Sequence, residues 1–131
     1  VKNWQEAIIF GGKILEAKGY IKNSYIDDML EMASKHSEYV VISEGVAIPH
    51  SKNRKNVFKT GVMLLTLKNA VTFPNGQEVD TFFIFSIYKK QEHLNAISEL
   101  IDLILKYDIR SCLKKAKNTD TVISFISNIE N

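Results

Sequence analysis

The run Val62-Met63-Leu64-Leu65-Thr66-Leu67 decides the fold class of this chain, because nearly every side chain in it is apolar. A strand with one solvent-exposed face would alternate apolar and polar residues, so this run predicts a strand that is buried on both faces. Residues 80–88 form a second long and mostly apolar segment, which is rich in Phe and Ile. Strands of this kind need helices packed over both faces of their sheet.

Helical periodicity lies on both sides of these strands. Apolar residues recur at helical spacing over residues 4–15, where Asn3 can cap the helix and Gly19 can end it, and again over residues 26–33. Residues 39–49, broken at Gly45, and residues 71–73 predict further strands. The segment from residue 92 onward predicts a helix, followed by two shorter ones around residues 109–116 and 121–129. We therefore expect an α/β fold, a three-layer αβα sandwich with a mixed sheet of about five strands flanked by helices.

The composition is that of an ordinary globular protein, with 131 residues, 45% hydrophobic and 24% charged residues, and a net charge of +2. This length fits one domain, residues 1–131, and the net charge is too small to indicate nucleic acid or an anionic membrane as a partner. No apolar run reaches the roughly 20 residues of a membrane-spanning helix. The single cysteine, Cys112, excludes an internal disulfide, fits a reducing cytoplasm and has the apolar neighbours of a core residue. The first residue is Val rather than Met, which leaves an excised domain of a longer protein as one alternative.

His50 is the first candidate for chemistry, in the run GVAIPHS at residues 45–51. Pro49 fixes its own φ and keeps the preceding backbone extended, so the histidine is presented on a stiff support. We expect it to be exposed at a strand end, as a nucleophile or ligand, and the alternative is a surface histidine beside a proline turn. His36, in a polar stretch after a predicted helix, indicates a cation at a helix C-terminus.

His93 is the second candidate, in the first turn of a predicted amphipathic helix. Free N–H groups and the helix dipole favour negative charge there, so its ring could donate a hydrogen bond to a bound anion. The alternative is a capping or partly buried histidine. The sequence has no Gly-rich phosphate loop, no nucleophile elbow and no CxxC or HExxH spacing, and two candidate histidines without a third ligand argue against a metal site.

Taken together, these segments resemble a known family. The strand-forming run at residues 39–42 followed by Gly-Val-Ala-Ile-Pro-His at residues 45–50 resembles the active-site signature of sugar phosphotransferase system (PTS) IIA domains. The type is the mannitol–fructose superfamily (type 2), and the closer match is to its ascorbate–galactitol branch. Residues 4–8, 18–21, 25–29 and 93–94 also match, so that the resemblance extends from about residue 4 to residue 129.

The resemblance implies a phosphotransferase component with a phosphohistidine intermediate. His50 would accept a phosphoryl group from the phosphocarrier protein HPr and pass it to a cysteine of a IIB domain. His93 would be the second active-site histidine and would hydrogen-bond the phosphoryl oxygens. Ser51 could hydrogen-bond the phosphoryl group or merely cap the next turn. The resemblance implies no cofactor, no metal, no direct contact with nucleic acid and no insertion into a membrane, and it does not identify the sugar.

The sequence departs from the family pattern on the second predicted helix. The mannitol branch carries an active-site arginine after a Met-Leu pair, whereas this chain has Met29-Leu30-Glu31-Met32. The missing role could be unneeded, or it could have moved to the basic loop that follows His50 and contains Lys52, Arg54, Lys55 and Lys59. The departure also keeps open a second function, a regulatory IIA-like domain of a larger transcriptional regulator in which phosphorylation of His50 is a signal.

Overall fold

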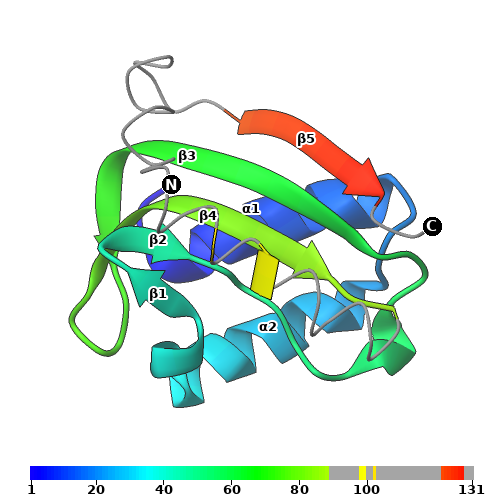
Figure 1. The fold of residues 1–131 in the computed structure, drawn as a ribbon, viewed down its shortest axis with the longest axis horizontal. Helices are drawn as coiled ribbons and strands as arrows, with labels where there is room; N and C mark the ends of the chain where they lie inside the picture. The colour runs from blue at the N-terminus through cyan, green and yellow to red at the C-terminus, as the bar shows by residue number, and fades with distance from the viewer. Residues whose placement is uncertain (89–97, 100–101, 103–121, 129–131) are drawn as a thin grey trace.

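The centre of the fold is a five-stranded mixed sheet with the strand order β1-β2-β4-β3-β5 (Figure 1). The computed structural model describes residues 1–88, 98–99, 102 and 122–128. Its strands are β1 (Val41–Ser43), β2 (Gly45–Ala47), β3 (Gly61–Thr72), β4 (Glu78–Ser86) and β5 (Val122–Asn128). Strand β2 runs parallel to β4, and the other neighbouring pairs are antiparallel. The expected mixed sheet is therefore confirmed.

Two helices, α1 (Trp4–Ala17) and α2 (Asn23–Lys35), flank the sheet, so the expected α/β class is confirmed as well. Helix α1 packs against β3 and β4, and α2 packs against α1. Asn3 caps α1 as expected, since its side chain accepts a hydrogen bond from the Glu6 amide at 2.8 Å. Gly19 has a φ of 82°, the left-handed conformation that favours glycine after a helix.

The predicted second layer of helices lies mostly outside the described residues. Of the helix expected from residue 92, only residues 98–99 and 102 are described, and these are helical. The helix expected around residues 109–116, with the proposed core position of Cys112, lies wholly outside them.

The helix predicted around residues 121–129 is wrong, because residues 122–128 form strand β5. This strand runs antiparallel to β3, with Leu65 opposite Val122 and Gly61 opposite Asn128. Its β-branched and aromatic residues fit a pleated sheet, and the edge of β3 offers them hydrogen-bonding partners that a sequence pattern cannot reveal. The separate strand expected at residues 71–73 is likewise part of the longer β3, which shifts register between Thr66 and Val71.

Aromatic side chains fill the space between the sheet and α1. Phe73 packs between Trp4 and Phe82, with ring centroids 5.4 Å and 6.0 Å apart, and both phenylalanines are almost fully buried. The middle of β3 and nearly all of β4 are buried, as the two apolar runs predicted. The sheet is thus a firm support for the segment that leaves β2 and leads to His50.

Candidate functional site

His50 lies three residues beyond the end of β2, in a segment that stays attached to the sheet. The Ile48 amide donates a hydrogen bond to the Val40 carbonyl at 2.7 Å, and the Phe85 amide donates to the Pro49 carbonyl at 2.9 Å. His50 is only 5% exposed. The expectation of an exposed histidine is therefore wrong, because β4 and its neighbours hold the segment within the fold instead of releasing it into a loop.

The His50 ring has a defined tautomer. Its Nδ1 lies 2.6 Å from the Ile48 carbonyl oxygen. A carbonyl oxygen only accepts, so this contact is a hydrogen bond when Nδ1 carries the proton and donates it. In the neutral ring the lone pair then resides on Nε2, the atom with nucleophilic character.

The surroundings of His50 favour its neutral form. Burial lowers the pKa of His50, the hydrogen bond to the Ile48 carbonyl partly opposes this, and the positive charge of Lys52 lowers the pKa further. An imidazole with a lowered pKa is unprotonated near neutral pH. The site therefore offers a nucleophilic nitrogen without needing a separate base.

Tyr25 joins α2 to the segment around His50 and was not singled out by the sequence. Its fully buried hydroxyl donates to the Phe85 carbonyl at 2.8 Å and accepts from the Ser51 amide at 3.0 Å. Burial raises the pKa of Tyr25, so the phenol keeps its proton. One signal was available, since a tyrosine beside the apolar stripe of a helix needs a polar partner when it is buried.

Ser51 is buried and shapes the turn that follows His50. Its Oγ accepts a hydrogen bond from the Asn53 amide at 3.1 Å, which is the capping role considered for it. His36 is the C-cap residue of α2, at the helix end where the sequence placed it, and its Nδ1 lies 3.6 Å from a carboxylate oxygen of Glu38. His93 lies outside the described residues, so its expected place beside His50 stays a prediction.

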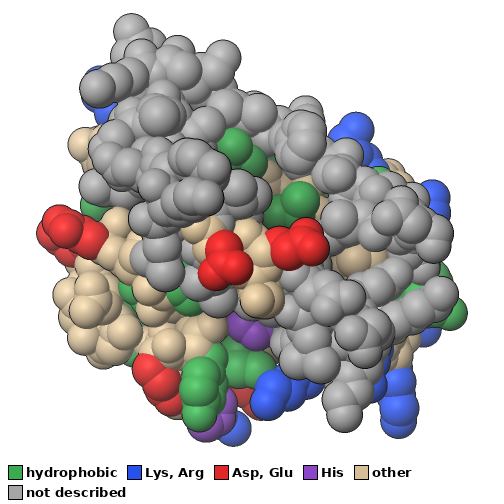
Figure 2. All heavy atoms as spheres, in the orientation of Figure 1, with side chains coloured by type: hydrophobic (Ala, Val, Ile, Leu, Met, Phe, Trp, Pro, Cys, Tyr) green, Lys and Arg blue, Asp and Glu red, His purple; other side chains and the backbone are tan. Residues whose placement is uncertain are grey.

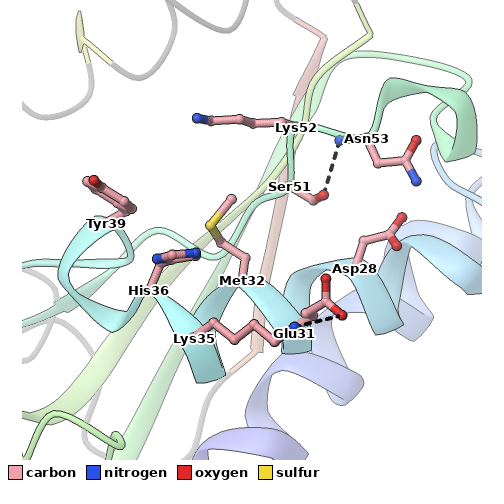
Figure 3. Close-up of a pocket in the computed structure, with 9 residues that line it drawn as sticks. All are labelled: Asp28, Glu31, Met32, Lys35, His36, Tyr39, Ser51, Lys52 and Asn53. Atoms are coloured by element: carbon pink, nitrogen blue, oxygen red, sulfur yellow. Dashed lines mark hydrogen bonds and ion pairs between the residues drawn. The ribbon is translucent and has the colours of Figure 1, made fainter.

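A groove of about 520 Å³ opens between α2 and the loop after His50 (Figure 3). Its lining residues are Asp28, Glu31, Met32, Lys35, His36, Tyr39, Ser51, Lys52 and Asn53. Met32 points from α2 toward the loop, and Lys52 extends over the groove from the opposite side. Glu31 and Lys35 lie 3.7 Å apart on α2. Lys52 thus lines the groove from the loop. It lies opposite the stretch of α2 in which the mannitol branch has an arginine and this chain does not.

The loop beyond the groove is basic and exposed. It contains the short 3₁₀ turn η2 (Arg54–Asn56), and its exposed cations are Lys52, Arg54, Lys55 and Lys59. Figure 2 shows basic side chains gathered at the lower right of the face viewed in Figure 1. No helix among the described residues is long and apolar enough to cross a membrane.

A family model and several known proteins match nearly the whole length of this chain. The model of the family described as "Phosphoenolpyruvate-dependent sugar phosphotransferase system, EIIA 2" matches residues 1–129. The mannitol-specific cryptic phosphotransferase enzyme IIA component of Escherichia coli (strain K12) is 32% identical over 127 residues, covering 96% of this chain and 86% of that protein. The ascorbate-specific PTS system EIIA component of Shigella boydii serotype 4 (strain Sb227) is 25% identical over 128 residues, covering 95% and 83%.

Solved structures share the fold. The solution structure of the mannitol-specific cryptic phosphotransferase enzyme IIA from Escherichia coli matches with a TM-score of 0.74 and 32% identity, covering 84% of this chain and 76% of that one. The Escherichia coli complex of enzyme IIA for mannitol and phosphorylated enzyme IIB matches with a TM-score of 0.66 over 79% of this chain and 73% of that one. At 23% identity, the second likeness concerns the fold alone.

Proposed function

The chain belongs to the EIIA 2 family of the phosphoenolpyruvate-dependent sugar phosphotransferase system, and from that premise we propose that His50 carries a phosphoryl group in transit. The family resemblance that the sequence indicated is confirmed, and with it the assignment to a component of a sugar phosphotransferase system. Relatives named for mannitol and for ascorbate both match, so the ascorbate–galactitol branch stays a prediction.

One observation carries the proposal most directly, the 2.6 Å contact between His50 Nδ1 and the Ile48 carbonyl. It selects the tautomer in which Nε2 has the lone pair, and burial keeps that ring neutral. The Nε2 lone pair attacks the phosphorus that HPr carries. The new N–P bond forms while the bond to the donor atom breaks, and its electron pair returns to HPr.

The second transfer reverses the roles. A cysteine thiolate of a IIB domain attacks the phosphorus, an S–P bond forms, and the electron pair of the N–P bond returns to Nε2. The phosphorylated ring is cationic because Nδ1 keeps its proton. The Ile48 carbonyl stabilises that positive charge, and a cationic imidazole is a good leaving group, so the bond stays labile. The Escherichia coli complex, in which a IIA pairs with a phosphorylated IIB, supports IIB as the acceptor here.

Three side chains would stabilise the phosphoryl group in this scheme. Lys52 already acts on His50 electrostatically, since its charge lowers the pKa of that ring, and the same charge would attract phosphoryl oxygens. It is our candidate for the role of the arginine that α2 lacks. His93 would donate a hydrogen bond to the phosphoryl oxygens, as the family resemblance implies. The Ser51 hydroxyl caps the next turn by accepting from the Asn53 amide, and it would still have its own proton to donate to those oxygens.

Labelling with radioactive phosphoenolpyruvate, enzyme I and HPr tests the proposal. We expect about one phosphoryl group per chain, and none on a His50→Gln variant, which keeps a polar side chain of similar size. His36→Gln is the matched control, because it removes a histidine from the exposed end of α2 and should be labelled normally. Normal labelling of the His50→Gln variant would reject the assignment.

The role of His93 needs a test that separates acceptance of the phosphoryl group from its transfer to a IIB domain. A His93→Ala variant should still accept the phosphoryl group but pass it poorly to a IIB domain. An unchanged transfer rate would return His93 to the alternative of a capping or partly buried histidine.

The regulatory alternative uses the same histidine, so labelling of His50 does not separate it from a carrier. Passage of the phosphoryl group from His50 to a IIB cysteine separates them, because a signalling domain need not pass its group on. The single domain over residues 1–131 and the cytoplasmic location stay predictions of the sequence.

A further inference from the structure

We infer that Tyr25 is a positioning residue for His50, because its hydroxyl is inserted into the parallel β2–β4 ladder at the point where the chain turns toward the histidine. This inference rests on the proposed role of His50 and assigns a residue that supports it. Tyr25 does not touch the reacting atoms in this scheme. It acts through the backbone on either side of the histidine.

The register of the sheet shows where the hydroxyl is inserted. Ala47 of β2 lies opposite Phe82 of β4, and the same register continued by three residues places His50 opposite Phe85. In a parallel ladder, the residue on one strand donates its N–H to the carbonyl before its partner and accepts from the N–H after it. The Phe85 amide does donate to the Pro49 carbonyl at 2.9 Å, so the first of these two bonds is present.

The second bond is replaced by two bonds through the phenol. The Ser51 amide donates to the Tyr25 hydroxyl at 3.0 Å, and that hydroxyl donates to the Phe85 carbonyl at 2.8 Å. An oxygen atom therefore lies between two groups that would otherwise bond directly. The segment diverges from β4 at this point while every backbone group involved stays paired.

The divergence occurs at the residue whose ring must be oriented. The backbone before His50 is held by Phe85, and the backbone after it is held by Tyr25, so the histidine lies between two fixed points. Its ring folds back over its own segment, where Nδ1 reaches the Ile48 carbonyl. The phenol thus helps to set the tautomer on which the proposed nucleophile depends.

Helix α2 gives the phenol a firm base. Tyr25 is fully buried, as are its helix neighbours Met29 and Ala33, and Ile26 is 4% exposed. The sole change in Tyr25→Phe would be the loss of one oxygen atom, with the ring and its packing kept. This substitution therefore separates the hydrogen bonds of the side chain from its bulk.

The test compares Tyr25→Phe with Tyr20→Phe, a matched loss of a phenolic hydroxyl at the α1–α2 junction. Nitrogen NMR of the His50 ring reports the tautomer and its pKa, and rapid mixing with phosphorylated HPr reports the rate of phosphoryl acceptance. For Tyr25→Phe we expect a smaller Nδ1–H population, a pKa of His50 closer to its ordinary value and an acceptance rate about tenfold lower. Tyr20→Phe should match the wild type in all three.

The inference would be overturned by a Tyr25→Phe protein whose His50 tautomer, His50 pKa and acceptance rate are those of the wild type. This holds whether or not the variant is less stable than the wild type. Failure of the proposed function appears differently, as wild-type protein that HPr does not label, and the NMR measurement then still decides whether Tyr25 orients the ring. Should Tyr25→Phe not fold, hydrogen exchange of the wild-type Ser51 amide decides, since slow exchange supports the bond to the phenol and fast exchange contradicts it.

Discussion

A methyl group added at Gly12 tests whether the close approach of α1 to α2 holds the site together. A Cβ at this position would lie 2.6 Å from Cγ1 and 3.0 Å from Cδ1 of Ile26, closer than such carbons pack. Ile26 is 4% exposed and cannot swing into solvent, so α2 must shift or the side chain must leave its rotamer. Overpacking costs about 1–3 kcal/mol, and a contact of 2.6 Å in a site closed to solvent belongs in the upper half of that range, about 2–3 kcal/mol. Ala in place of Gly gains about 1 kcal/mol in helix propensity, which leaves a net loss of about 1–2 kcal/mol.

We therefore expect Gly12→Ala to lower the free energy of unfolding by about 1–2 kcal/mol, which corresponds to a fall of roughly 4–8 °C in Tm. Urea unfolding followed by circular dichroism gives the midpoint and the slope, and an unchanged slope would show that only stability has changed. Lys13→Ala is the matched control on the same helix. It removes an exposed side chain whose contact with Glu16 is 3.5 Å long, and should change stability by less than about 0.5 kcal/mol.

The consequence for the site distinguishes local crowding from a shift of α2. Because α2 carries Tyr25, a shift of this helix should also reduce the Nδ1–H population of the His50 ring in NMR spectra. A Gly12→Ala protein as stable as the wild type would refute the reasoning, since helix propensity would then outweigh the contact with Ile26.

Three further changes have definite expected outcomes. Asn3→Ala removes the side-chain cap of α1 and should lower the free energy of unfolding by about 1 kcal/mol, and an unchanged thermal midpoint would contradict this. Burial lowers the pKa of His50, so the unfolded chain binds its proton more readily. The stability contribution of His50 is therefore complete above its ordinary pKa near 6.5 and falls as the pH drops toward the folded pKa. A His50→Gln variant should lose this part of the pH dependence, which lies below about pH 6.5, and unfolding curves that depend on pH as the wild type does would argue against it. Lys52→Ala should raise the pKa of His50 and slow phosphoryl acceptance several-fold, whereas Lys55→Ala in the same loop should change neither, as NMR titration and rapid mixing would show.

Local sequence patterns were sufficient for the central strands and the first helix. The apolar runs at residues 62–67 and 80–88 could be buried on both faces only within a helix-covered sheet, and β3 and β4 contain all of the first run and most of the second. Asn3 and Gly19 marked the ends of α1 because capping and a positive φ depend on one or two residues. Residues 122–128 were predicted to be helical and form a strand instead, because the pairing with β3 that decides between the two involves residues far away in the sequence.

The sequence could propose a candidate residue but not its environment. The proline before His50 and the family resemblance indicated this histidine as the candidate, whereas its burial depends on Phe85 and Tyr25, which lie 35 and 25 positions away in the sequence. The hydroxyl of Tyr25 hydrogen-bonds to Ser51, which follows His50, and to Phe85 of β4. Contacts at such separations are set by the packing of α2 on the sheet, which a pattern of single residues does not contain.

The burial of His50 places opposite demands on the proposed carrier. A site that is 5% exposed favours a neutral imidazole and so prepares the nucleophile, but it opposes the arrival of a charged phosphoryl group. The proton on Nδ1 resolves part of this conflict, because the phosphorylated ring becomes a cation held by the Ile48 carbonyl. Lys52 offsets the remaining negative charge from the loop. Both groups are in place around the resting ring, where the Ile48 carbonyl holds the Nδ1 proton and Lys52 disfavours a second proton, and both would stabilise the phosphoryl group once it has arrived, which is the combination that a phosphoryl carrier requires.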